Sequence, residues 1–156
     1  MKEVHLERIE TFNKRLETLY NKICQWLDEL QIEYTRQEKE MSLTEQKNMT
    51  YTTKELDIFT KEGESLFCIV PYGVWIIGAE GRVELEGDSG SESLVYLLGK
   101  EPSPLITEIE SEKDKIIRKK LNGPRQEGWH WVDERIIGKR PLLTKDIFMA
   151  LLEKIN

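Results

Sequence analysis

The stretch from Leu66 to Leu98 reads LFCIVPYGVWIIGAEGRVELEGDSGSESLVYLL, in which short apolar runs alternate with turns that contain glycine. Such runs, bounded by Gly, Pro, Asp and Ser, are typical of β-strands joined by tight turns. The intervals between them are too short for helical crossovers, so neighbouring strands are expected to run antiparallel. Together with the segment before Leu66, the pattern predicts a meander over residues 49–99. The predicted strands are 51–59, 66–70, 74–77, 82–86 and 94–98.

The first 34 residues predict a long helix, over about residues 3–34. Apolar residues recur there at steps of three and four, and the opposite face is polar. The stripe consists of Ile9, Phe12, Leu16, Leu19, Ile23, Trp26 and Leu30, widened by Tyr20 and Leu27. A widened stripe favours packing on the protein's own sheet. A coiled coil that joins two copies of the chain is the alternative, because the heptad pattern extends over about three repeats.

The remaining segments complete the expected architecture. Residues 35–48 are polar and are interpreted as a loop or a frayed helix end. A short helix at 111–121, a strand at 129–132 and a helix at 144–155, begun by Thr144, follow the meander. We therefore expect one α+β domain over residues 1–156. In this two-layer sandwich, the N-terminal and C-terminal helices pack on one face of an antiparallel meander.

Length and composition exclude several classes of protein. The chain has 156 residues, too few for most two-domain proteins. No apolar run approaches the roughly 18–20 residues that a membrane helix needs. The N-terminal letters MKEVHLERIE lack the apolar core of a signal peptide. We therefore expect a cytoplasmic protein without membrane contact.

Motifs for catalysis or cofactors are scarce. Gly87-Asp88-Ser89-Gly90 resembles the segment around the nucleophile of chymotrypsin-like proteases, but the only upstream histidine is His5, on the predicted helix. A hairpin turn explains the same letters. Cys24 and Cys68 have no metal-ligand spacing and are interpreted as buried, inert thiols. We expect no cofactor and no catalysis, although a carboxylate-only Mg²⁺ site stays open as an alternative.

The most unusual local feature is Trp129-His130-Trp131. On a strand, the two tryptophans share a face and His130 points the other way. We favour tryptophans that cover the core, with His130 at the surface. The alternative is an aromatic platform surrounded by basic groups, suited to single-stranded nucleic acid or to a protein interface. The surrounding basic residues are Lys119, Lys120, Arg125, Arg135, Lys139 and Arg140.

Charge is segregated along the chain, whose formal net charge is −6. Residues 76–112 contain two basic and nine acidic groups, whereas residues 113–145 contain ten basic and four acidic groups. The acidic set is either a solvated sheet edge or a recognition surface for a basic partner. Its members are Glu80, Glu84, Glu86, Asp88 and Glu92.

Charge complementarity leads to a functional hypothesis. Bacterial immunity proteins and antitoxins, which are small and acidic, bind basic partners in this way, and the analogy covers charge and size only. We expect a cytoplasmic, bacterial, non-catalytic protein-binding module, immunity-like or an accessory subunit. The alternative is a nucleic-acid-associated factor that uses residues 113–145, and self-association through the N-terminal helix is a further possibility. The expected contact residues are Glu80, Glu84, Glu86, Asp88, Lys119, Lys120, Arg125, Trp129, Trp131 and Arg135.

Overall fold

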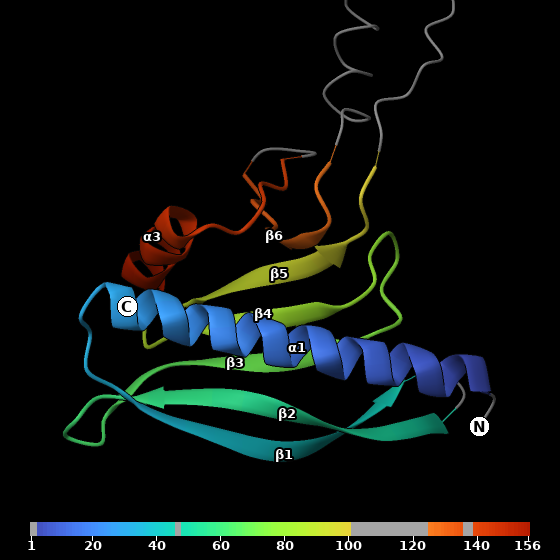
Figure 1. The fold of residues 1–156 in the computed structure, drawn as a ribbon, viewed down its shortest axis with the longest axis horizontal. Coiled ribbons are helices and arrows are strands. Elements are labelled where there is room, and N and C mark those ends of the chain that lie inside the picture. Colours follow the sequence, from blue (N-terminus) through green and yellow to red (C-terminus); the bar gives the residue numbers. More distant parts are fainter. Residues whose placement is uncertain (1–2, 46–47, 101–124, 136–138) are drawn as a thin grey trace, which may run out of the picture.

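A long helix, a six-stranded antiparallel sheet and a C-terminal helix make up the computed structural model (Figure 1). The structure describes residues 3–45, 48–100, 125–135 and 139–156. The elements are α1 (Glu3–Glu29), β1 (Thr35–Glu45), β2 (Met49–Phe59), β3 (Ser65–Gly73), β4 (Arg82–Glu86), β5 (Ser91–Leu97), β6 (Gly128–Trp131) and α3 (Lys145–Ile155). The strands lie in the sheet in chain order, β1 to β6, so the predicted α+β layout with a β-meander is confirmed. The expected helix at 111–121 lies outside the described residues.

The N-terminal helix ends at Glu29, earlier than the apolar pattern predicted. Gln31 has a positive φ of 59°. Its backbone amide donates a hydrogen bond to the carbonyl of Asp28, and the amide of Ile32 donates to the carbonyl of Leu27. This pair of hydrogen bonds is a Schellman motif, which satisfies the last carbonyls of a helix. Glycine usually occupies the left-handed position, so a glutamine there gave no sequence signal.

The expectation of a loop at residues 35–48 is wrong, because most of that segment is the edge strand β1. It pairs with β2 along its whole length, from Thr35 opposite Phe59 to Glu45 opposite Met49. Most β1 side chains are exposed, so the strand lacks the alternation of apolar and polar residues that reveals a half-buried strand. Its stability comes from backbone hydrogen bonds to β2, which depend little on the identity of the side chains.

A second difference concerns residues 74–77, which form no strand. They lie in a tight turn with an isolated bridge between Ile76 and Ala79. The carboxylate of Glu45 accepts hydrogen bonds at 3.1 Å from the amides of Val74 and Trp75, which therefore do not join a strand ladder. The β3 strand continues through Pro71 to Gly73, and its pairing with β4 shifts register between these two residues.

Both described helices pack on the same face of the sheet. The ring of Phe148 on α3 lies 5.6 Å from the ring of Trp26 on α1 and 5.6 Å from that of Phe67 on β3. The α1 stripe from Ile9 to Leu27 is buried in this core, so the interpretation as self-packing is confirmed for those positions. The inward-facing core positions of the strands are Leu56, Ile58, Phe67, Ile69, Val83, Leu85, Leu94 and Trp129.

Candidate functional site on the open face of the sheet

The face of the sheet opposite the two helices carries most of the ionisable groups of its central strands. We call it the open face and define it by Glu55, Asp57, Cys68, Val70, Arg82, Glu84 and Glu86, which alternate along β2, β3 and β4 with the core residues. The register aligns Asp57, Cys68 and Glu86 in one row across three strands. Side chains opposite each other in an antiparallel pair lie on the same face and within contact distance.

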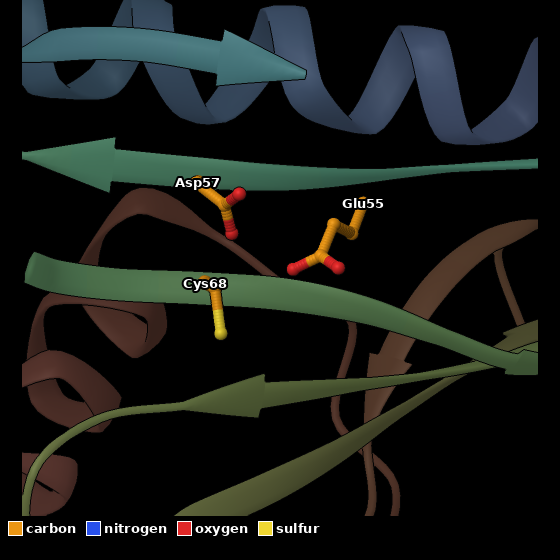
Figure 2. A group of neighbouring side chains, drawn as sticks. All are labelled: Glu55, Asp57 and Cys68. Atoms are coloured by element: carbon orange, nitrogen blue, oxygen red, sulfur yellow. The ribbon is translucent and has the colours of Figure 1, made fainter. Parts of the chain in front are cut away.

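Within the open face, four side chains form a compact group that we call the Cys68 cluster: Glu55, Asp57, Cys68 and Glu86. The ligating atoms of the first three all lie within 4.8 Å of one another, and all three side chains are half-buried. Glu55 and Asp57 extend from β2 toward Cys68 on the neighbouring strand β3 (Figure 2). The thiol of Cys68 also lies 3.6 Å from Oε2 of Glu86 and donates to it. The cluster therefore brings one sulfur and three carboxylates together.

The cluster has an excess of negative charge. Burial, a hydrogen bond with Asp57 and the charge of Asp57 raise the pKa of Glu55 above its ordinary value. Burial and the charge of Glu86 raise the pKa of the Cys68 thiol to about 12, so this thiol is protonated at neutral pH. In the described part of the chain, no lysine or arginine forms an ion pair with Glu55, Asp57 or Glu86.

The neighbouring carboxylate of Glu84 is neutralised within the protein. Arg82 lies 2.6 Å from it in an ion pair, and the hydroxyl of Ser93 donates to the same oxygen at 2.8 Å. The guanidinium of Arg82 also covers the ring of Tyr72, 4.6 Å from its centroid. Glu84 is therefore less available to a partner than the three carboxylates of the Cys68 cluster.

The acidic residues singled out from the sequence are not brought together as one surface. Glu80 pairs with Arg8 of α1 at 3.4 Å, and Asp88 lies in the β4–β5 turn beside the C-terminal Asn156. Glu92 pairs with Lys154 and accepts from the indole of Trp131, so it faces the helical side. Only Glu84 and Glu86 belong to the open face.

Sequence reasoning missed Glu55 and Asp57 as site residues and placed Cys68 in the core. Cys24 is buried as expected, but Cys68 is half-buried on the open face, so the core interpretation of Cys68 is wrong. The alternation Glu55-Leu56-Asp57-Ile58 was a usable signal, because it places both carboxylates on one face of a strand. The apolar run around Cys68 concealed the thiol, since adjacent strand residues face opposite sides.

The aromatic segment is organised around the core. Trp129 is buried and its indole donates to the carbonyl of Arg15 at 3.3 Å, while Trp131 is half-buried. His130 is only 3% exposed, so the expectation of a surface histidine is wrong. Its ring nitrogens lie 2.8 Å from the carbonyl of Arg140 and 2.9 Å from that of Gln126, and the segment that follows Arg140 pairs with the edge of β6 through a bridge between His130 and Leu142.

Two of the basic residues near the aromatic segment, Arg125 and Arg135, bond to groups within the protein. Arg125 donates to the carbonyl of Leu98 at 2.9 Å. Arg135 forms a two-pronged contact with Asp133, at 2.9 and 3.0 Å, and lies over the ring of Trp131. Lys119 and Lys120 lie outside the described residues. Since Trp129 is buried, the two tryptophans do not form an exposed stacking platform.

No protein-family model matches the chain, and neither the curated proteins nor the solved structures contain a significant match to it. Among the described helices, none has the combination of length and apolarity that crossing a membrane requires.

The repulsion in the Cys68 cluster predicts a pH-dependent loss of stability. The pKa of Glu55 is higher in the folded protein than in the unfolded chain. The protonated carboxyl is therefore compatible with the fold at low pH, and stability is lost as pH rises through the folded-state pKa and the carboxyl ionises. We expect Glu55→Gln to raise the urea midpoint of unfolding at pH 7, and this gain to shrink at about pH 4, where free glutamate is largely protonated. Chemical unfolding of both proteins at the two pH values measures the effect.

The control for this prediction is Glu7→Gln, at an exposed position on α1. It removes the same charge from the helical side and should leave the midpoint nearly unchanged at both pH values. A lower midpoint for Glu55→Gln at pH 7 would contradict the prediction, because it would mean that the ionised Glu55 stabilises the fold.

Proposed function

We propose that this protein is a non-catalytic, cytoplasmic binding module that recognises a basic protein partner through the open face of its sheet. The observation that carries the proposal is the group of three carboxylates, Glu55, Asp57 and Glu86, which have no ion-paired cation in the described part of the chain. A partner that supplies arginine or lysine side chains would relieve their repulsion on binding.

The position of the carboxylates supports recognition by a protein. Two project from β2 and one from β4, on either side of β3, so the sheet register holds them in place and little side-chain or loop entropy is lost on binding. Complementary charge raises the rate of association and excludes acidic competitors. The immunity-like or accessory-subunit role and the bacterial origin remain parts of this proposal.

The nucleic-acid alternative has less support. Trp129 is buried, Arg135 is paired with Asp133, and the open face is acidic. Acidic surfaces repel the phosphate backbone, on which the affinity of most nucleic-acid-binding proteins depends.

The proposal is tested first with a defined probe, a fluorescent oligoarginine peptide. We expect wild-type protein to bind it with an affinity that falls as salt rises, as measured by fluorescence anisotropy. The triple variant Glu55→Gln, Asp57→Asn, Glu86→Gln should bind about ten-fold more weakly, since three solvent-accessible ion pairs at about 0.5 kcal/mol each amount to that factor. The matched control, Glu7→Gln, Glu10→Gln, Glu17→Gln, removes three charges from exposed positions of α1.

The control should bind like wild type, because its substitutions lie on the helical side. Equal weakening of both variants would reduce the effect to net charge and overturn the proposal.

The same three proteins are then used as baits in native lysate, with and without nuclease. A stoichiometric protein partner should be retained by wild type and control in both halves and be lost by the open-face variant. Partners that disappear with nuclease would favour the nucleic-acid alternative.

A further inference from the structure

The Cys68 cluster combines two kinds of metal ligand, carboxylate oxygen and thiol sulfur, and the partner-binding proposal uses only the carboxylates. Cys68 offers a sulfur, and Glu55, Asp57 and Glu86 offer carboxylate oxygens, all from neighbouring strands. We infer that these four side chains form a binding site for a thiophilic divalent cation, of which Zn²⁺ fits the donor set. The inference does not rest on the proposed function, because a metal ion can be titrated without any partner.

The distances within the cluster suit a small tetrahedral ion. Zinc binds sulfur at about 2.3 Å and carboxylate oxygen at about 2.0–2.2 Å, so neighbouring donors lie about 3.3–3.7 Å apart around it. The separation of 3.6 Å between Sγ of Cys68 and Oε2 of Glu86 already falls in this range. The atoms of Glu55, Asp57 and Cys68, within 4.8 Å of one another, reach it by small side-chain rotations.

The charge of the site also indicates a cation. Three carboxylates converge on one thiol, and in the described part of the chain none of the three has an ion-paired lysine or arginine. Lys39 is aligned with Glu55 in the β1–β2 register and forms no ion pair with it in the described structure; its charge lowers the pKa of Glu55, but burial and Asp57 outweigh it and the pKa is raised. The lack of an ion pair at these three carboxylates, among the described residues, is a second observation beside the distances between the ligand atoms.

The sulfur decides which ions fit. Thiolate is a soft ligand that favours zinc over magnesium and calcium, which take oxygen donors. Binding replaces the thiol proton of Cys68, and any proton held on the Glu55 carboxylate, by the metal ion, and these protons pass to solvent. Cadmium shares the preference of zinc for sulfur, and its bond to thiolate absorbs in the ultraviolet, so Cd²⁺ serves as a probe.

The test is a titration of metal-free, full-length protein with Cd²⁺, read by the thiolate-to-cadmium absorption band. We expect a band that saturates at one equivalent, with release of about one proton or more per ion, and displacement by Zn²⁺ but not by excess Mg²⁺. Cys68→Ser should abolish the band, while Cys24→Ala, at the buried thiol in α1, should keep it. Asp57→Asn and Glu55→Gln should each weaken binding about ten-fold or more.

Several results would overturn the inference. The inference is wrong if wild-type protein shows no band, or if Cys24→Ala loses the band and Cys68→Ser keeps it. An unchanged affinity in both carboxylate variants would indicate that a lone thiol binds the ion. Circular dichroism checks that Cys68→Ser is folded, and the carboxylate variants decide the matter if it is not. A saturable band without any oligoarginine binding would contradict the proposed function while supporting the metal site.

Discussion

Replacing Ile23 with aspartate is expected to unfold the protein. Ile23 is fully buried in α1, within the core between the helix and the sheet. A carboxylate there would be buried among apolar side chains, so its burial costs several kcal/mol, comparable with the total stability of a typical domain of about 5–15 kcal/mol. Circular dichroism and thermal melting should show a largely unfolded chain at 25 °C.

The matched control for this substitution is Lys22→Asp, at the neighbouring exposed position of α1. It introduces the same side chain on the solvent face and should cost at most about 1 kcal/mol. If the Ile23 variant stayed folded and lost only self-association in sedimentation or light scattering, the stripe would be a coiled-coil interface. The packing of α1 against its own sheet would then be contradicted.

Phe148→Ala is expected to have the second largest effect, a loss of about 3–5 kcal/mol in the free energy of unfolding. The ring of Phe148 is fully buried and contacts Trp26 of α1 and Phe67 of β3. Its removal leaves a cavity at the point where both helices meet the sheet. Urea unfolding, followed by tryptophan fluorescence and circular dichroism, measures the change.

Glu153→Ala on the exposed side of α3 is the corresponding control. It should change stability by no more than about 0.5 kcal/mol, because the side chain is solvated and alanine favours helix. A cost below about 1 kcal/mol for Phe148→Ala would mean that α3 detaches easily. The C-terminal helix would then contribute little to the core.

Elements that bury an apolar face were predictable. The α1 stripe, the alternation of β4 and the capping of α3 by Thr144, whose hydroxyl accepts from the amide of Ile147, are all encoded by residues close in sequence. Each leaves a periodic signal because water selects against exposing that face. The β1 strand left no such signal, since its side chains are mostly exposed at the edge of the sheet.

The candidate site was harder to predict than the fold. The acidic residues of 76–112 are close in sequence, but Glu80 and Glu92 turn to the helical side, while Glu86 joins Glu55 and Asp57 from β2. Proximity in sequence is a poor guide to a shared surface in a meander, because adjacent residues of one strand face opposite sides of the sheet, whereas residues of successive strands meet across it.

Local patterns in the sequence specify the N-terminal and C-terminal helices, an antiparallel meander and most of the apolar core, because burial of apolar surface imposes a period of 3.6 or 2 residues. The tertiary structure alone decided that residues 35–45 form a strand, because an edge strand is stabilised by the backbone hydrogen bonds of its partner. The composition of the Cys68 cluster likewise depends on the tertiary structure. Asp57, Cys68 and Glu86 meet only through the register of β2, β3 and β4, which depends on how the strands align their apolar residues on the opposite face.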